Sequence, residues 1–155
     1  MQRGKDVRLS GKRIVLLIVT ALTVVFIFGQ SFLPKRVSAG ESGWVEDSIL
    51  DPIFRFFGME PPDDHIVRKT AHIAEFAVLS VLLVFCFRGQ IARSAGVAFC
   101  TAFLDESIQL LTDRGALISD VWIDLIGIAI GTLIGFLLLK AIRGRHKKTK
   151  ENGSV

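Results

Sequence analysis

Residues 14–33 read IVLLIVTALTVVFIFGQSFL, a run of twenty residues that contains no charged side chain. As an α-helix this run would be about 30 Å long, which matches the hydrocarbon thickness of a bilayer. Backbone amides and carbonyls find no water inside a bilayer, so a segment that crosses it has to be helical. The run therefore predicts a first transmembrane helix over residues 14–33.

The rest of the chain repeats this pattern. Three further apolar runs lie at residues 70–87, 91–112 and 121–139, and most charged residues lie between the runs or in the tails. Hydrophobic residues make up 50% of the 155 residues, and their concentration in long runs excludes an ordinary soluble domain. Both cysteines, Cys86 and Cys100, lie inside apolar runs, which excludes a secreted disulfide scaffold. The sequence predicts an all-α membrane protein with four transmembrane helices.

The basic residues predict the orientation of these helices. Thirteen of the nineteen Lys and Arg residues lie in the tails, residues 1–13 and 140–155, and at the short connection after the second run, which contributes Arg88 and Arg93. Because Lys and Arg accumulate on the cytoplasmic side of membrane proteins, both termini are expected in the cytoplasm of a cell membrane. Residues 14–139 then form the transmembrane domain. The clustering of basic residues at the two ends also makes nucleic acid a poor candidate partner.

The first run admits a second interpretation. A basic tail, an apolar run and the small residues Val37, Ser38 and Ala39 resemble a signal peptide with its cleavage site. The run is long for such a signal, and Lys35 and Arg36 intervene, so a retained helix is favoured. Cleavage would remove the first helix and leave the orientation of the other three helices in the membrane unchanged.

The longest connection, residues 34–69, is expected outside the cytoplasm. Within it, residues 44–57 place Trp44 and several aliphatic and Phe residues near helical spacing, with acidic residues on the other side. The segment is too short to span a bilayer, and Trp is typical of the headgroup boundary. It is interpreted as an interfacial segment resting on the membrane, and the alternative is a lid over a site.

The polar residues within the runs gather at one end of the bundle. Successive helices alternate in direction, so the start of the second run, the end of the third and the start of the fourth share the outer leaflet. Their polar residues are His72, Glu75, Asp105, Glu106, Gln109 and Asp124, predicted to line an outward-facing pocket, and Arg68, Lys69, Arg114 and Asp120, predicted to form its rim. Ionisable residues inside a membrane usually have a function, although mutual pairing that only locks the helices together is the alternative.

Spacing places these residues on shared helix faces. Arg68, His72 and Glu75 follow an i, i+4, i+7 pattern, and Asp120 and Asp124 are four residues apart. The face below Asp124 continues with Gly127, Gly131 and Gly135, a small-xxx-small pattern that lets two helix backbones approach closely. Asp124 is therefore expected to point into the bundle.

Three motifs resemble those of the VanZ-like family of bacterial membrane proteins. They are residues 68–76 (RKTAHIAEF), residues 105–109 (DESIQ), and Arg114 followed by residues 120–127 (DVWIDLIG). The family often has Pro-Gly before the arginine, where this chain has Thr112 and Asp113. The resemblance carries over the ten polar residues already named as pocket and rim. It implies a role in the bacterial cell envelope and a link to resistance against the glycopeptide teicoplanin, and it supplies no reaction.

The chemistry of the pocket residues leaves several functions open. Arg68, Lys69 and Arg114 could hold a phosphate or carboxylate of an amphiphilic or lipid-linked envelope molecule, with membrane lipids around it. An enzyme acting on a lipid-linked precursor could use His72 as general base, oriented by Glu75, with another carboxyl group as acid. A divalent cation could bind His72, Glu75 and Asp124, and no other cofactor is expected. Ion transfer is disfavoured because the inner leaflet lacks a polar path.

Overall fold

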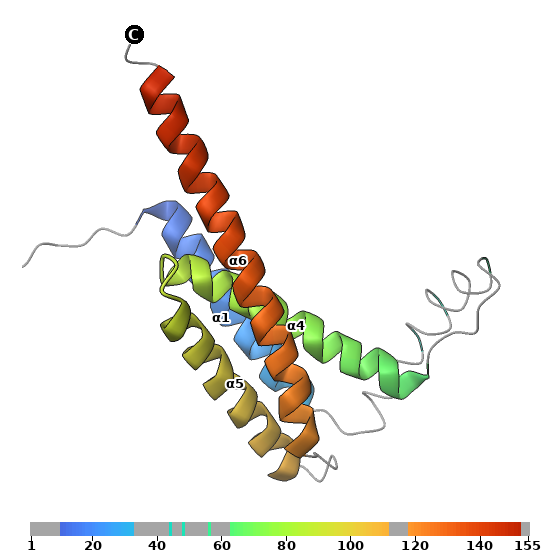
Figure 1. The fold of residues 1–155 in the computed structure, drawn as a ribbon. Coiled ribbons are helices and arrows are strands. Elements are labelled where there is room, and N and C mark those ends of the chain that lie inside the picture. Colours follow the sequence, from blue (N-terminus) through green and yellow to red (C-terminus); the bar gives the residue numbers. More distant parts are fainter. Residues whose placement is uncertain are drawn as a thin grey trace, which may run out of the picture.

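The computed structural model describes residues 10–32, 44, 48, 56, 63–111 and 118–152. These residues form four α-helices (Figure 1). Their bounds are α1, Gly11–Phe32; α4, Asp64–Cys86; α5, Ile91–Leu111; and α6, Ile118–Asn152. The prediction of an all-α fold with four helices is confirmed.

Three of the helices in the described part are long and apolar enough to cross a membrane. These stretches are Gly11–Phe32, Ile66–Cys86 and Asp120–Arg145. The fourth helix, α5, has 21 residues, and its C-terminal part is less apolar because it contains Asp105, Glu106 and Gln109. Of the four helices, α5 is thus the one that does not reach the hydropathy of a span.

Two helices extend further than the apolar runs predict. α4 begins at Asp64 instead of residue 70, and α6 continues to Asn152, well beyond residue 139. Apolar runs mark the part of a helix that lies in lipid, whereas polar and basic residues can continue the same helix into water. At the start of α4 the carbonyl of Asp63 accepts the backbone N–H groups of Ile66 and Val67, at 2.7 and 3.1 Å.

Helices α4 and α6 run parallel and in direct backbone contact. A Cβ added at Gly127 would clash with the carbonyl oxygen of Ile73, and one added at Gly131 would clash with that of Ala77. At Gly135 it would lie 3.1 Å from Val81 Cα. The contacts advance by four residues on each helix, so the three glycines form one straight seam along α4.

The remaining helices alternate in direction. The hydroxyl of Thr20 in α1 lies 3.3 Å from the Cys86 thiol at the end of α4, so these two helices are antiparallel. The turn after α4 has positive φ angles at Arg88 and Gly89, and the Arg143 guanidinium of α6 donates to the Arg88 carbonyl at 2.8 Å. The start of α1, this turn and the C-terminal half of α6 therefore share one end of the bundle (Figure 1).

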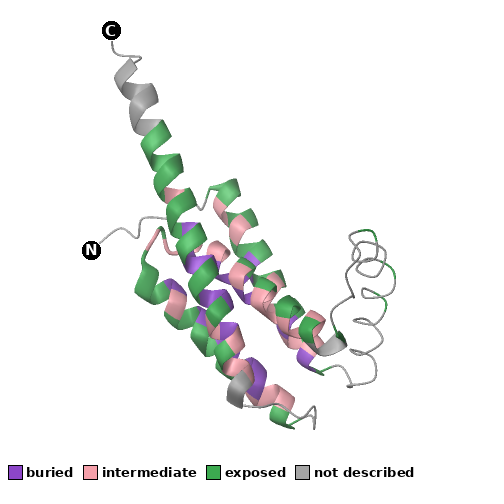
Figure 2. Ribbon diagram, turned by 45° about the vertical axis from the view of Figure 1, so that its right-hand side comes forward, coloured by how far each residue is buried: buried purple, intermediate pink, exposed green. Residues whose placement is uncertain are grey.

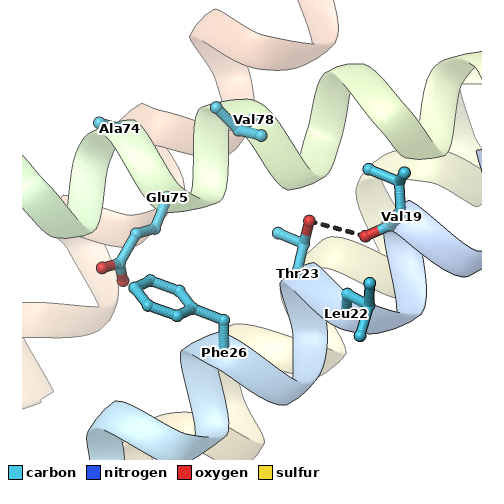
Figure 3. Close-up of a pocket in the computed structure, with 7 residues that line it drawn as sticks. All are labelled: Val19, Leu22, Thr23, Phe26, Ala74, Glu75 and Val78. Atoms are coloured by element: carbon cyan, nitrogen blue, oxygen red, sulfur yellow. Dashed lines mark hydrogen bonds between the residues drawn. The ribbon is translucent and has the colours of Figure 1, made fainter.

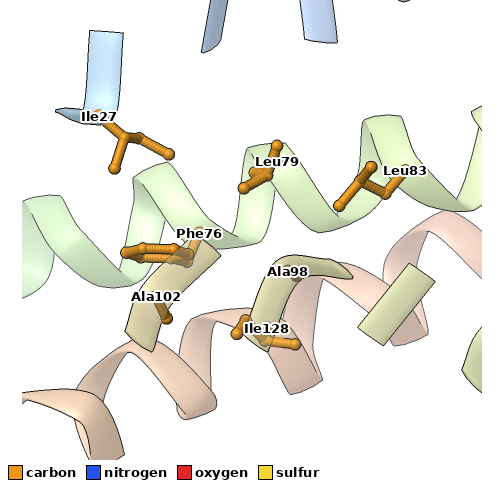
Figure 4. Packing of buried hydrophobic residues seen from close by; sticks show 7 residues of the cluster. All are labelled: Ile27, Phe76, Leu79, Leu83, Ala98, Ala102 and Ile128. Atoms are coloured by element: carbon orange, nitrogen blue, oxygen red, sulfur yellow. The ribbon is translucent and has the colours of Figure 1, made fainter. Parts of the chain in front are cut away.

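The core is small and lies between the four helices. Its buried apolar residues are Ile27, Phe76, Leu79, Leu83, Ala98, Ala102 and Ile128 (Figure 4). Many other large apolar residues of the described helices are exposed (Figure 2), and Val25, for example, is 66% exposed. Lipid tails solvate apolar side chains, so an outward-facing apolar surface costs a membrane protein nothing and needs no second layer.

Candidate binding site

The first part of the site lies between α4 and α6. The Nδ1 atom of His72 is 3.8 Å from Glu75 Oε2 and 4.0 Å from Asp124 Oδ1. One turn earlier, the Lys69 ammonium is 4.0 Å from Asp120 Oδ1. The glycine seam accounts for this placement, because Gly127 rests on the backbone of Ile73 and so holds Asp124 beside His72. The structure thus brings together predicted residues of the first and third motifs.

The second part of the site joins α1 to α5. The Ser31 hydroxyl donates a hydrogen bond to Asp105 Oδ1, and the Gln109 amide donates to Asp105 Oδ2 at 2.8 Å and contacts Ser31 Oγ at 3.4 Å. Asp105 is fully buried. Sequence reasoning missed Ser31, although its position near the end of the first run places it in the same leaflet as the other polar residues.

The two parts belong to one electrostatic unit. The Asp124 carboxylate interacts electrostatically with those of Asp105, Glu106, Asp120 and Glu75. We refer to these five residues as the carboxylate cluster. Three helices contribute to it, and three of its members, Asp105, Glu106 and Asp124, are buried. Such a concentration of carboxyl groups in a bundle this small is unfavourable unless something compensates the charge.

Glu106 is the least compensated member of the cluster. It is 5% exposed, and its Oε1 atom has no hydrogen-bond partner among the described residues. It interacts electrostatically with Asp120 and Asp105. Leaving a buried polar atom without a partner costs about 1–3 kcal/mol, and more when the group is charged.

Two predicted features lie outside the part of the chain that the structure describes. Arg114 falls within residues 112–117, and the interfacial segment at 44–57 is described only at residues 44, 48 and 56. Arg68, the other predicted rim arginine, is half-buried on α4, one turn before His72. Binding at the pocket and rim residues stays a prediction.

An apolar groove runs between α1 and α4 and ends at the cluster. It has a volume of about 470 Å³ and is lined by Val19, Leu22, Thr23, Phe26, Ala74, Glu75 and Val78. Figure 3 shows the Glu75 carboxylate beside the Phe26 ring, and the Thr23 hydroxyl hydrogen-bonded to the Val19 carbonyl of its own helix at 2.9 Å. Of the predicted pocket residues, the groove contains Glu75. Composition alone does not reveal it, because a groove depends on how two helices cross.

The described residues give the metal alternative no geometric support. Within residues 10–32, 63–111 and 118–152, no group of three His, Cys, Asp or Glu side chains is arranged to hold a metal ion. His72, Glu75 and Asp124 approach one another, and their separations of 3.8–4.0 Å are those of loose ion pairs.

Comparisons with known proteins place the chain in a family. The family described as VanZ/LLP1 matches residues 14–139. The "Uncharacterized membrane protein YwnJ" of Bacillus subtilis (strain 168) is 39% identical over 84 residues, which are 54% of this chain and 58% of that relative. No solved structure matches the chain. The family match covers most of the chain, and it confirms the resemblance that the three motifs indicated. This multi-pass membrane protein therefore belongs to the VanZ/LLP1 family.

Proposed function

We propose that this protein recognises an amphiphilic or lipid-linked molecule of the bacterial cell envelope. The polar head of the ligand would meet the carboxylate cluster and His72, while its apolar chain would lie in the groove between α1 and α4. The observation that carries this proposal is the position of Glu75, which lines the groove and also contacts His72 at 3.8 Å. Such an arrangement of one apolar surface and a few polar groups is typical of ligand sites.

We further propose that the cluster faces the outside of the cell. The end of the bundle opposite the cluster carries the basic residues Arg88, Arg93, Lys140, Arg143 and Arg145, which favour a cytoplasmic location by the positive-inside rule. Envelope molecules and glycopeptides such as teicoplanin would then reach the site from the outer leaflet. Recognition of such molecules would give the protein a role in glycopeptide resistance.

A comparison of strains tests the proposal. We expect deletion of the gene to change susceptibility to a glycopeptide that carries an acyl chain, and to leave susceptibility to its deacylated form unchanged. His72→Ala, Glu75→Gln and Asp124→Asn should reproduce the deletion while the protein still inserts at the normal level. Loss of membrane insertion in all three variants would instead support the alternative that these residues only lock the helices together.

A second measurement on the same strains separates binding from catalysis. The proximity of His72 to two carboxyl groups is the observation that favours an enzyme, because a carboxylate can orient a histidine general base. Lipid-linked precursors would be extracted from cells with and without the gene and compared by mass. A change in the mass of a precursor indicates a reaction, and precursor that co-purifies unaltered indicates recognition.

A further inference from the structure

We infer that the turn between α4 and α5, residues 87–90, and the facing part of α6 form a binding site for the phosphate head group of an anionic phospholipid. The turn and α6 meet at the end of the bundle opposite the carboxylate cluster (Figure 1). The residues that form the site are Arg88 in the turn and Lys140 and Arg143 on α6. Both this ligand and this end of the molecule differ from those of the proposed function, so either can hold without the other.

The turn is held against α6 by a hydrogen bond and by close packing. The Arg143 guanidinium donates to the Arg88 carbonyl at 2.8 Å. Gly89 has a φ of +87°, and a Cβ added there would lie 3.1 Å from the Leu139 side chain and 3.8 Å from Arg143 Nη1. Leu139 and Arg143 are four residues apart, so one face of α6 meets the turn. Two arginines from different parts of the chain are thereby brought to one place.

The charge of this end favours an anionic partner. Arg88, Lys140 and Arg143 are all exposed, and Lys140 lies one helical turn before Arg143 on α6. The segments that adjoin this end in the sequence have the same charge. Together, residues 1–13, 87–93 and 140–155 contain 13 Lys or Arg residues and two acidic residues, a count that covers every residue of the three segments. Such an excess of positive charge attracts anions to the surface that carries it.

The site lies at the depth of lipid phosphates. Arg88 is two residues past Cys86, where α4 ends, and Lys140 directly follows Leu139, the last residue of the apolar run of α6. Exposed apolar residues flank the basic ones, namely Ile91 at 43%, Leu138 at 48% and Ile142 at 45%. A phospholipid presents acyl chains directly beside its phosphate, so this pairing of apolar and basic side chains matches a lipid better than a soluble anion.

The two guanidinium groups suit a lipid phosphate, because parallel N–H donors of a guanidinium match two phosphate oxygens. A guanidinium has five donors, and the bond to the Arg88 carbonyl uses one donor of Arg143. Arg143 can therefore hold the turn and bind a phosphate at the same time. Phosphatidylglycerol has a net negative charge, whereas phosphatidylcholine adds a cationic choline group that basic residues repel. The site is expected to prefer the anionic lipid.

Native mass spectrometry of the full-length protein in detergent tests the inference. The protein is mixed with equal amounts of phosphatidylglycerol and phosphatidylcholine that have identical acyl chains, and phosphatidylglycerol should be retained preferentially. Arg88→Gln should weaken its retention roughly fivefold, the change in affinity expected for one basic residue near a lipid phosphate. This substitution keeps the backbone carbonyl that accepts the bond from Arg143, so the turn stays attached to α6.

The matched control is Lys12→Gln, which removes one positive charge from an exposed position at the same end of the bundle. Lys12 lies about 12 Å further along α1 than Thr20, the residue that contacts Cys86 at the end of α4. Its substitution should leave the retention of phosphatidylglycerol unchanged. Equal losses in Lys12→Gln and Arg88→Gln would overturn the inference, since they would show a diffuse attraction to all basic residues of this end.

Thermal unfolding gives a second readout. Phosphatidylglycerol should raise the melting temperature of the parent protein more than that of Arg88→Gln, because a ligand stabilises the state that binds it. An equal rise in both proteins would overturn the inference, as would equal retention of the two lipids by the parent protein. Displacement of phosphatidylglycerol by an equal concentration of glycerol phosphate would also overturn it, because the site would then take a soluble phosphate.

Discussion

At the scale of single residues, two neighbouring buried carboxyl groups differ in the hydrogen bonds that they accept. Asp105 is buried and accepts hydrogen bonds from Ser31 and Gln109, so it ties α1 to α5. Glu106, the next residue in the chain, is also buried, and its Oε1 atom has no hydrogen-bond partner among the described residues. The two adjacent carboxyl groups therefore differ: Asp105 joins two helices, and Glu106 Oε1 makes no hydrogen bond within the described part of the chain.

The structural task of Ser31 gives the first prediction. Ser31→Ala removes one donor to Asp105, so the buried carboxylate loses a hydrogen bond that joins α5 to α1 and keeps the one from the Gln109 amide. Hydrogen bonds between membrane helices contribute about 0.6 kcal/mol on average and up to about 1.7 kcal/mol, and a value near the upper end is expected because Asp105 is fully buried. Thermal unfolding in detergent measures the effect.

The control for Ser31 is Ser107→Ala, whose hydroxyl donates to the Phe103 carbonyl of its own helix at 2.7 Å. That bond ties no helix to another, so its loss should leave the melting temperature within experimental error of the parent protein. Equal effects of the two substitutions would show that the Ser31–Asp105 contact does not hold α1 in place.

At the scale of helices, the parallel packing of α4 on α6 determines the geometry of the site. Because Gly127, Gly131 and Gly135 have no side chain, the two backbones approach closely enough for His72 and Asp124 to come within 4.0 Å. A larger residue in the seam would separate the helices and with them the first and third motifs.

The seam gives the second prediction. Gly131→Ala would place a Cβ against the backbone of Ala77, which cannot move away as a flexible side chain could. Overpacking of this kind costs about 1–3 kcal/mol, and thermal unfolding should show a lower melting temperature. The matched control is Gly96→Ala in α5, where nothing lies within 4 Å of the added Cβ. That change should be neutral or stabilising by up to about 1 kcal/mol, since Ala favours helix over Gly. The opposite order would contradict the packing.

The sequence predicted the helices and the gathering of polar residues better than it predicted the helix ends or the groove. The apolar runs and the i, i+4 spacing of Asp120 and Asp124 depend on local order in the chain, which the sequence displays directly. The ends of α4 and α6 lie in polar segments, where apolar periodicity carries no signal. Ser31 and the α1–α4 groove depend on how helices cross, and this information appears only in the folded bundle.

At the scale of the whole molecule, charge is distributed unevenly between the two ends of the bundle. One end holds the carboxylate cluster, and the other holds the turn at Arg88 and the basic C-terminal part of α6. Such an asymmetry favours one orientation in the membrane, with the basic end in the cytoplasm. We propose that the cluster faces outward, where envelope molecules would have access to it.

Single-cysteine labelling in intact cells tests this orientation. After Cys86 and Cys100 are replaced by Ser, an Asp63→Cys variant should react with a membrane-impermeant maleimide added outside, because Asp63 is exposed at the cluster end. Arg145→Cys, exposed at the opposite end, should react only after the membrane is opened. Labelling of Arg145→Cys in intact cells would reverse the orientation and place the cluster in the cytoplasm.

The central claim is that Glu75 connects a lipid-accessible groove to the carboxylate cluster, and chemical modification in the membrane tests it most directly. Dicyclohexylcarbodiimide is an apolar reagent for carboxyl groups that partitions into bilayers, and mass spectrometry of the treated protein identifies the modified residues. We predict that Glu75 reacts before the buried Asp124 and Asp105, and that Leu22→Trp, which fills the groove, protects it, whereas Val25→Trp, at an exposed position outside the groove, does not. Preferential modification of Asp124, or modification of Glu75 that Leu22→Trp leaves unchanged, would contradict it.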